Sequence, residues 1–408
     1  MAHNVIVEAK RCLNCKNPQC MKGCPISTNI PSFISTLLSG NIQKAGKQLF
    51  DNNPLSVVCS MVCNHEKQCQ GHCVLGIKGH PVEISTIENY VSERYLDNLE
   101  LEKAEPNGIK VAVVGAGPAG ITISIKMAQL GYDVTVFESK PKIGGVLRFG
   151  IPEFRLPKSI LDRYEKLMRK LGIKIKPNIT IGKTFGVEEL FRDGFKAISI
   201  GTGVTYPNTL NIKGETLAHV HYGVHYLKSP ESYVLGNNLV VIGGGNVAMD
   251  VARTAMRQGV KNVKITVRSN SLSANKEESE YAEIEGAEFM YNLAPIEITD
   301  DGVIFKKTVT SEDGKVNYTD ETYLEKCDSV IICISQKPSN LILTQTKGLE
   351  INEKGLAKIS PDGVTSRPGI FASGDVVKGA KTVVEAVETS KRVALAMDEY
   401  LKSLPKDN

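Results

Sequence analysis

The sequence predicts an α/β protein, in which a small helical domain precedes two strand–helix–strand units, one nested within the other. Eight of the ten cysteines lie between Cys12 and Cys73, among stretches with helical periodicity. A buried strand, a glycine loop and a helix occur in that order twice, over residues 111–130 and 239–257. Residues 369–401 form a strand, a Gly-Asp turn and a long amphipathic helix, typical of a tail that returns to the first unit.

The length and charge of the chain exclude several classes of protein. A chain of 408 residues predicts two or three domains. The 49 basic and 45 acidic residues give a net charge of +4 without a basic block, which argues against nucleic-acid binding. Apolar runs such as Val330–Ile334 are too short to span a membrane, and Met1–Lys10 lacks the plan of a signal peptide. We therefore expect a cytoplasmic protein.

The helical domain and its boundary are predicted from apolar spacing. Ile30–Leu38, Ile42–Phe50 and Ile84–Leu99 repeat apolar residues at intervals near 3.6, which predicts three helices. A polar hinge over Glu102–Asn107 precedes a buried strand over Ile109–Val114. The predicted domains are residues 1–107, residues 108–228 together with 342–408, and residues 229–341.

The first glycine loop has the three glycines of a dinucleotide-binding fingerprint. Gly115 makes the tight turn, Gly117 lets the backbone approach a pyrophosphate, and Gly120 lets helix and strand pack closely. The next strand, Asp133–Phe137, ends at Glu138, where an acid can accept hydrogen bonds from ribose hydroxyls. The predicted nucleotide-binding residues here are Gly115, Ala116, Gly117, Pro118, Ala119, Gly120 and Glu138.

The second glycine loop follows the strand that begins at Leu239, and the strand after it, Val263–Val267, ends at Arg268. An arginine at this position suits the 2′-phosphate of NADP, so NADP is slightly favoured over NAD. Arg268 is also compatible with a solvated charge at a strand end. The predicted residues of this second site are Gly243, Gly245, Asn246, Val247, Ala248 and Arg268.

Two nucleotide-binding loops in series predict a flavin that is bound permanently by the first unit and a nicotinamide cofactor that binds reversibly to the second. Residues 201–203 follow the strand Ala197–Ile200 and mark where the chain leaves the first unit. The helix that starts near Thr382 is placed to point its N-terminal dipole at the flavin, although an ordinary closing helix fits equally well. The flavin-binding residues predicted outside the first loop are Gly201, Thr202, Gly203, Gly374, Asp375 and Thr382.

The cysteines form two runs, Cys12-x2-Cys15-x4-Cys20-x3-Cys24-Pro25 and Cys59-x3-Cys63-x5-Cys69-x3-Cys73. Disulfide scaffolds suit small secreted domains, so thiolate ligation of metal is the better interpretation. Zinc sites pair two Cys-x2-Cys knuckles, which the second run lacks, whereas Cys-x3-Cys-Pro is a ferredoxin-like ending. Two [4Fe-4S] clusters are therefore favoured over zinc, with Cys24 at a different cluster from Cys12, Cys15 and Cys20.

The chain resembles a family that contains the glutamate synthase small subunit, the large flavin subunit of ferredoxin:NADP transhydrogenases and the N-terminal half of dihydropyrimidine dehydrogenase. The resemblance implies a helical iron–sulfur domain followed by two nested Rossmann-like domains of a disulfide-reductase-like flavoprotein. It adds Gly145 and Arg148 to the predicted FAD site. The matching segments are Arg11–Pro25, Asn53–Cys73, Gly115–Gly120, Gly144–Pro157, Gly243–Arg253 and Gly374-Asp375.

The resemblance also implies the ligands of the two clusters. One cluster would use Cys12, Cys15, Cys20 and Cys73, and the other Cys24, Cys63, Cys69 and Glu88, which leaves Cys59 spare. A carboxylate ligand changes charge and hydrogen bonding, so Glu88 would tune the potential of its cluster, whereas the alternative for Glu88 is a solvated helix acid. Relatives that bind NADPH tightly often have paired arginines where this chain has Arg268-Ser269, which leaves the choice between NADPH and NADH open.

These features predict an electron-transfer flavoprotein subunit that passes electrons between NAD(P)H, FAD, two [4Fe-4S] clusters and a partner protein, in either direction. The candidate partners are a glutamate synthase large subunit, a ferredoxin or another redox enzyme. No side chain is assigned as a catalytic acid, base or nucleophile, because hydride transfer needs only positioning and cofactor potential. The alternatives are a free-standing or bifurcating ferredoxin:NAD(P) oxidoreductase and, from another class, a zinc-stabilised dinucleotide-binding sensor.

Overall fold

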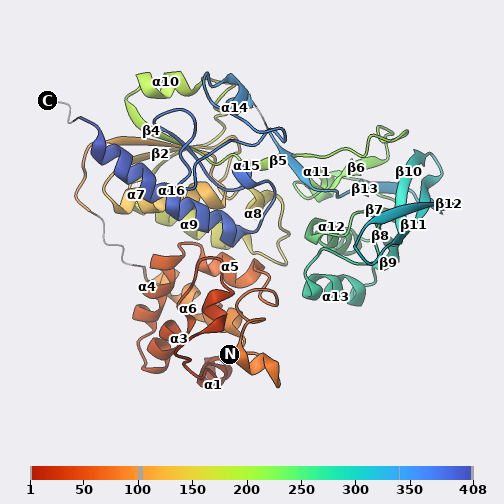
Figure 1. Cartoon of the computed structure of the whole chain (residues 1–408), viewed down its shortest axis with the longest axis horizontal. Coiled ribbons are helices and arrows are strands. Elements are labelled where there is room, and N and C mark those ends of the chain that lie inside the picture. Colours follow the sequence, from red (N-terminus) through yellow and green to blue (C-terminus); the bar gives the residue numbers. More distant parts are fainter. Residues whose placement is uncertain (1, 100–103, 340, 406–408) are drawn as a thin grey trace. The chain divides into compact units, whose positions relative to one another are not determined.

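A computed structural model describes residues 2–99, 104–339 and 341–405 (Figure 1). The chain forms two compact units. The first contains Met1–Arg148, Glu153–Val204 and Pro338–Asn408, and the second contains Phe149–Pro152 and Thr205–Lys337. The boundaries predicted for three separate domains are not tested by this division into two units and stay a prediction.

The N-terminal part of the first unit is helical, as expected. Its elements are α1 (Ala2–Lys10), α2 (Gln19–Lys22), α3 (Ile30–Leu38), α4 (Ile42–Asn52), α5 (Ser56–Val62), the 3₁₀ helix η1 (Val74–Ile77) and α6 (Ile84–Asp97). The Asn29 and Asn41 side chains cap α3 and α4 by accepting hydrogen bonds from the N–H groups of Ser32 and Lys44. Phe33 of α3 and Ile87 of α6 lie in the core between the helices.

The rest of the first unit is a parallel sheet in the order β15-β4-β1-β2-β3, flanked by helices. The strands are β1 (Lys110–Val114), β2 (Asp133–Phe137), β3 (Lys174–Lys176), β4 (Phe195–Ile200) and β15 (Ile370–Ala372). The helices are α7 (Pro118–Gln129), α8 (Val146–Phe149), α9 (Lys158–Lys170), α10 (Val187–Arg192), α14 (Leu341–Gln345), α15 (Asp375–Lys378) and α16 (Val383–Ser403). The C-terminal segment rejoins this sheet because β15 pairs with β4. Strand order reverses beside β1, and ligands of such sheets bind at the carboxyl ends of the strands at this point.

The second unit repeats the plan, with a sheet in the order β6-β13-β7-β8-β9. Its strands are β6 (Val220–Tyr222), β7 (Asn238–Ile242), β8 (Asn262–Val267), β9 (Glu288–Tyr291) and β13 (Ser329–Ile332). Its helical elements are α11 (Gly223–Tyr226), η2 (Pro230–Ser232), α12 (Asn246–Arg257) and α13 (Lys276–Ile284). The short strands β5 (Val204–Pro207) and β14 (Gln336–Pro338) pair where the chain enters and leaves this unit.

One part of the second unit differs from the expected strand–helix–strand pattern. The strands β10 (Leu293–Thr299), β11 (Gly302–Thr310) and β12 (Val316–Lys326) form an antiparallel sheet. Gly302 and Gly314 adopt positive φ angles of 149° and 80° at its two turns. These connections are too short to hold the crossover helix that parallel strands require.

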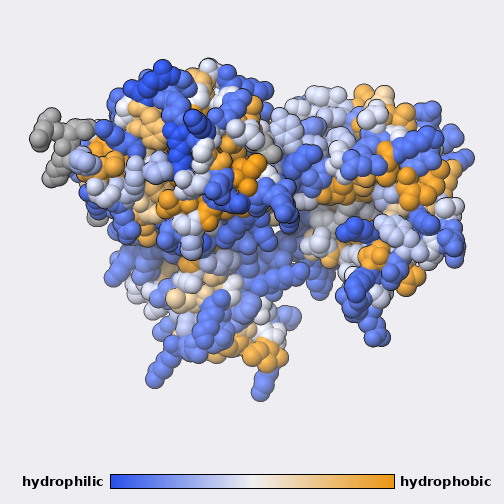
Figure 2. Space-filling view, turned by 45° about the horizontal axis from the view of Figure 1, so that its top comes forward, coloured by the Kyte–Doolittle hydropathy of each residue, from blue (hydrophilic) through white to orange (hydrophobic). Residues whose placement is uncertain are grey.

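The surface is mostly hydrophilic on the face seen in Figure 2, where apolar residues form small separate patches. Within the described ranges, no helix combines the length and the apolar character needed to cross a membrane.

Candidate cofactor sites

The first glycine loop leaves no room for side chains at two of its glycines. Gly115 has a φ of +96°, and a Cβ atom there would lie 2.6 Å from the Gly201 carbonyl oxygen. A Cβ atom on Gly120 would lie 1.8 Å from the Gly115 carbonyl oxygen. The loop is therefore packed tightly between β1, α7 and the segment that follows β4.

Gly117 is different, because it faces open space at the start of α7. A Cβ atom on Gly117 would meet only the Gly145 Cα atom, at 3.8 Å, and the residue has ordinary extended backbone angles. Pro118 occupies the first turn of α7, where a missing N–H costs nothing. The small residues thus form a backbone cradle at a helix N-terminus, which fits a pyrophosphate.

Glu138 lies beside this cradle, buried at the end of β2. Its carboxylate accepts hydrogen bonds from the N–H groups of Ala116 at 2.7 Å and Lys140 at 2.8 Å. The Ser139 hydroxyl donates to the same carboxylate at 3.1 Å. The carboxylate is therefore held in place by neutral donors, which fits the predicted role of Glu138 in binding a ribose.

The C-terminal segment adds residues to the same edge of the sheet. A Cβ atom on Gly374 would lie 3.1 Å from the Ala119 Cβ atom, so the Gly374-Asp375 turn packs on the start of α7. Burial raises the pKa of Asp375 to about 7. The Thr202 hydroxyl is buried without a hydrogen-bond partner, in the turn that also contains Gly203, which has a φ of +66°. The residues present fit the flavin nucleotide predicted for this unit.

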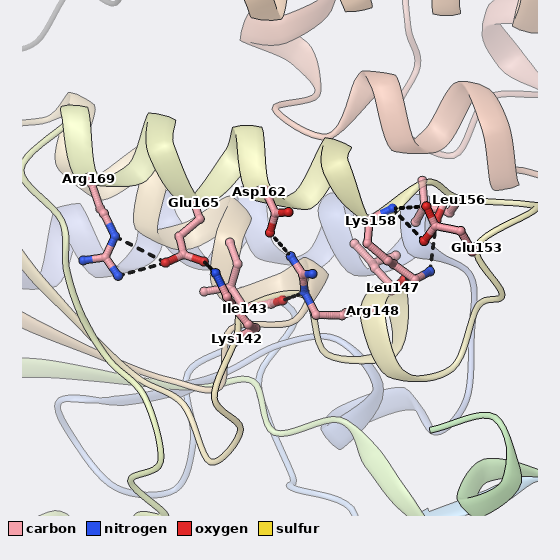
Figure 3. Close-up of polar contacts among 10 residues, drawn as sticks. All are labelled: Lys142, Ile143, Leu147, Arg148, Glu153, Leu156, Lys158, Asp162, Glu165 and Arg169. Carbon is pink, nitrogen blue, oxygen red and sulfur yellow. Dashed lines mark hydrogen bonds and ion pairs between the residues drawn. The ribbon is translucent and has the colours of Figure 1, made fainter. Parts of the chain in front are cut away.

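Arg148 is already engaged in this structure (Figure 3). Its Nε atom donates to the Ile143 carbonyl at 2.8 Å, and its Nη2 atom donates to Asp162 of α9 at 2.7 Å. Lys158, at the start of α9, donates from Nζ to the carbonyls of Leu147 and Leu156, each at 2.9 Å. These bonds fasten the segment around Gly145 to α9, and the sequence analysis missed both Asp162 and Lys158. Lys158 directly follows the Gly144–Pro157 segment that carries the family resemblance, and this position in the sequence could have indicated its role.

Thr382 is the N-cap of α16, as the sequence predicts for the helix start. Its side chain accepts a hydrogen bond from the Glu385 N–H, and the Glu385 carboxylate accepts one from the Thr382 N–H at 3.0 Å. This capping box occupies the Thr382 hydroxyl and fixes the first turn of the helix.

The second glycine loop has the same design as the first. A Cβ atom on Gly243 would lie 2.4 Å from the Cys333 carbonyl oxygen, whereas one on Gly245, the N-cap of α12, would meet nothing closer than 3.6 Å. The Asn246 side chain accepts a hydrogen bond from the Asn275 N–H at 2.8 Å. Val247 and Ala248 continue into α12, and Ala248 is fully buried.

Arg268 lies exposed at the end of β8. Its carbonyl accepts a hydrogen bond from the Thr308 hydroxyl at 2.6 Å, which fixes its backbone. Its guanidinium forms no hydrogen bond or ion pair with the residues that the structure describes. This free cation and the open N-terminus of α12 fit a nicotinamide dinucleotide.

The first group of cysteines, called the outer set, contains Cys12, Cys15, Cys20 and Cys73. Burial and the neighbouring thiolates of Cys73, Cys12 and Cys15 together raise the pKa of Cys20 to about 11. Burial also raises the pKa of Cys12, with Cys15 and Cys73 adding to the effect. The fold thus gathers four thiols from two segments about fifty residues apart in sequence.

The second group, called the inner set, contains Cys24, Cys59, Cys63, Cys69 and Glu88. A hydrogen bond with Cys59, burial and the charges of Glu88 and Cys69 raise the pKa of Cys63. Burial, together with the charges of Glu88 and Cys24, raises the pKa of Cys69. Burial raises the pKa of Glu88 to about 8, so this residue is not a freely solvated helix acid. Cys59, which the sequence analysis left spare, belongs to the same group.

The inner set is joined to the C-terminal helix of the first unit. Cys24, Cys59 and Cys63 pack with Val383 and Val384, the first two residues of α16. No sequence pattern indicates this contact, because more than 300 residues separate its partners. No three His, Cys, Asp or Glu side chains of the described ranges are arranged to hold a single metal ion.

Two family models match the chain. Residues 1–99 match the dihydropyrimidine dehydrogenase domain II, 4Fe-4S cluster. Residues 109–390 match the pyridine nucleotide-disulphide oxidoreductases, with a further match over residues 70–194. The first model describes an iron–sulfur domain and the second a nucleotide-binding oxidoreductase.

Several relatives are similar over nearly the whole chain. The glutamate synthase [NADPH] small chain of Halomonas elongata is 31% identical, over 97% of this chain and 90% of the relative. The NAD-dependent dihydropyrimidine dehydrogenase subunit PreT homolog of Salmonella typhi is also 31% identical, over 97% of this chain and 94% of the relative.

Solved structures show the same nucleotide-binding fold. Mycobacterium tuberculosis FprA in complex with NADPH is 18% identical, with a TM-score of 0.64 over 72% of this chain and 85% of that structure. Thioredoxin reductase of T. acidophilum is 23% identical, with a TM-score of 0.56 over 72% of this chain and 98% of that structure. The chain therefore belongs to the pyridine nucleotide-disulphide oxidoreductase family, in the branch with an N-terminal 4Fe-4S domain, as an NAD(P)H-dependent oxidoreductase whose cofactors are FAD and 4Fe-4S clusters.

Proposed function

We propose that the chain is an electron-transfer subunit, in which NAD(P)H binds the second unit, FAD binds the first, and two [4Fe-4S] clusters occupy the outer and inner sets. The partner is a glutamate synthase large subunit, a ferredoxin or another redox enzyme. The observation that carries the proposal is the contact between Cys24 and Cys63 of the inner set and the first residues of α16. This contact joins the cysteine domain to the helix whose N-cap, Thr382, is predicted to face the flavin.

A bound flavin accepts a hydride as an electron pair and gives up single electrons, which is the exchange that a [4Fe-4S] cluster supports. The residues of this chain bind and position the cofactors. Gly117 and Gly145 leave space for a pyrophosphate, and Glu138 is held ready to bind a ribose. The inner set would hold the cluster nearer to the flavin domain, and the outer set the cluster from which a partner takes electrons.

In the inner set, Glu88 is the proposed fourth ligand and Cys59 the spare thiol. Glu88 contributes to the raised pKa of both Cys63 and Cys69, which supports a place for its side chain near both thiols. The Cys59 thiol is buried and hydrogen-bonds to the thiol of Cys63, a proposed ligand, which favours a role for Cys59 in orienting that ligand.

Oxygen-free protein mixed with NADPH tests the proposal. We expect bleaching of the flavin absorbance followed by reduction of a one-electron protein acceptor. Cys24→Ser should disturb one cluster and slow the onward transfer while flavin bleaching continues. Cys327→Ser is the matched control, because Cys327 is a buried thiol of the second unit. If Cys24→Ser lost the inner cluster but still served the protein acceptor at the full rate, the inner set would not lie on the electron path.

A further inference from the structure

Two short segments that carry the outer set come together in the fold. These are residues 10–24 and residues 66–81. Arg11 of the first segment donates to the His80 carbonyl at 2.6 Å and to the Pro81 carbonyl at 3.1 Å. A Cβ atom on Gly23 would lie 2.4 Å from the Nδ1 atom of His72, so the two segments also meet at a second point. Together they form one continuous surface around the outer set.

Basic residues outnumber acidic ones in the two segments of this surface, and one of them, Arg11, is paired with Glu8 at 2.6 Å. The two segments contain six Lys or Arg residues and one Glu, a net charge of +5, whereas the whole chain has +4. The rest of the chain therefore has a net charge of −1. Residues 10–24 contribute four of the basic residues and no acidic one, and folding adds Lys67 and Lys78 of the second segment. The exposed lysines of the surface are Lys10, Lys16, Lys22, Lys67 and Lys78.

These five lysines are available to a partner. Within the described part of the chain, none of them forms an ion pair. A surface on which free cations gather attracts acidic proteins over long range and speeds their association.

Two apolar side chains project among the lysines. Leu13, directly after Cys12, is 62% exposed, and Ile77, four residues after Cys73, is 79% exposed. Cys12, Cys15 and Cys73 are themselves only half-buried. Apolar side chains surrounded by charged ones are typical of the interfaces of transient complexes.

We propose that this surface, called the basic face, docks a carrier protein that accepts or gives one electron and has an acidic contact surface. Leu13 and Ile77 would make the central contact, and the lysines would pair with carboxylates of the carrier. The step moves one electron between the outer cluster and the carrier and transfers no atom or proton. The inference rests on the proposed function, because it needs a cluster in the outer set.

The test uses the cofactor-loaded full chain and two acceptors. An acidic ferredoxin is the protein acceptor, and menadione is a small neutral acceptor that needs no docking surface. We expect Lys16→Glu/Lys78→Glu to lower kcat/KM for the ferredoxin roughly tenfold or more. Menadione reduction and iron content should stay unchanged. Lys347→Glu/Lys354→Glu is the control, because it reverses two exposed charges elsewhere in the first unit.

Each result decides a separate claim. A larger ferredoxin loss in Lys16→Glu/Lys78→Glu than in the control, reduced by added salt, supports the basic face. Equal losses in the two variants, or no reduction of ferredoxin by unaltered protein that still reduces menadione, would overturn it. A protein that contains iron and flavin but reduces neither acceptor would instead refute the proposed function. Ile77→Ser tests the apolar contact separately and should raise KM for ferredoxin without changing menadione reduction.

Discussion

The hydroxyl of Tyr164 in α9 donates a buried 2.7 Å hydrogen bond to the carbonyl of Pro54, just before α5. It joins the nucleotide-binding part of the first unit to the cysteine-bearing helices. The same helix carries Asp162, which holds Arg148 beside the first glycine loop. Farther along the chain, Lys391 of α16 donates to the Asn52 side chain at 2.6 Å. The two proposed cofactor regions of the first unit are thus fixed to each other by named polar contacts.

Tyr164→Phe should weaken this junction. The substitution leaves the Pro54 carbonyl buried without a donor, which costs about 1–3 kcal/mol. We expect a lower midpoint of urea unfolding. The unfolding is monitored through the absorbance of the clusters and, in parallel, the absorbance of the flavin. Tyr400→Phe is a suitable control, because it removes a hydroxyl elsewhere in the first unit. An unchanged midpoint in Tyr164→Phe would show that the bond contributes nothing to the junction.

The two N-cap glycines give a paired prediction. An alanine at Gly117 or Gly245 meets no atom closer than 3.6 Å, so either substitution should leave the apoprotein stable to within about 0.5 kcal/mol. Its methyl group would nevertheless occupy space that a pyrophosphate needs. Gly117→Ala should therefore lose FAD, and Gly245→Ala should keep FAD but bind NAD(P)H more weakly.

Each of these variants is the control for the other, with FAD content and NAD(P)H titration as the measurements. Loss of both ligands in both variants would point to general misfolding. Full retention of FAD in Gly117→Ala would contradict the assignment of the first loop.

Glu88→Ala should alter one cluster only. Removing the proposed carboxylate ligand changes the charge at the inner set, so the potential and the EPR spectrum of one cluster should change. FAD content should remain the same. Glu66→Ala, at an exposed acid of the same domain, is the control. If redox titration found both clusters unaltered in Glu88→Ala, this residue would not be a ligand.

Arg268→Ala should weaken NADPH binding more than NADH binding. The exposed guanidinium is free to pair with the 2′-phosphate, which only NADPH carries. The change in the ratio of the two Kd values is the measurement, with Lys326→Ala as a control for the loss of one charge. Equal weakening of both dinucleotides would leave Arg268 as a solvated charge.

Asp375 gives a pH prediction for the apoprotein. Its pKa is raised to about 7 by burial, well above the value of about 3.9 in an unfolded chain. The contribution of this carboxyl to stability is therefore fully present below about pH 4, is lost as the pH rises through about 7, and changes little at higher pH. Asp375→Asn cannot ionise, so its stability should fall less between pH 5 and pH 8, which urea unfolding at each pH measures. Parallel stability curves for the two proteins would contradict the raised pKa.

Local pattern was enough to predict the main helices and strands. Ile30–Leu38 and Asp133–Phe137 were predicted and observed with the same bounds, because apolar spacing and buried runs are read within one segment. The antiparallel strands β10 to β12 were missed. The turns at Gly302 and Gly314 are local signals of antiparallel pairing that the expected alternation of strands and helices did not include.

The candidate sites were predictable only in part. The spacing of the glycines and of the cysteines was enough to predict which of these residues belong to a site, because each motif is local in sequence. Contacts such as Tyr164 with Pro54, or Val384 with Cys59, join segments far apart and depend on how the helices pack. The basic face depends partly on packing too, since it joins the basic segment 10–24 to Lys67 and Lys78 of a segment more than forty residues away.

The iron, sulfide and flavin content of oxygen-free protein decides whether the chain carries the proposed electron relay. We expect about eight iron atoms and about eight sulfide ions per chain, with one FAD. A colourless protein with zinc in place of iron, or an iron protein that holds no flavin, would contradict it.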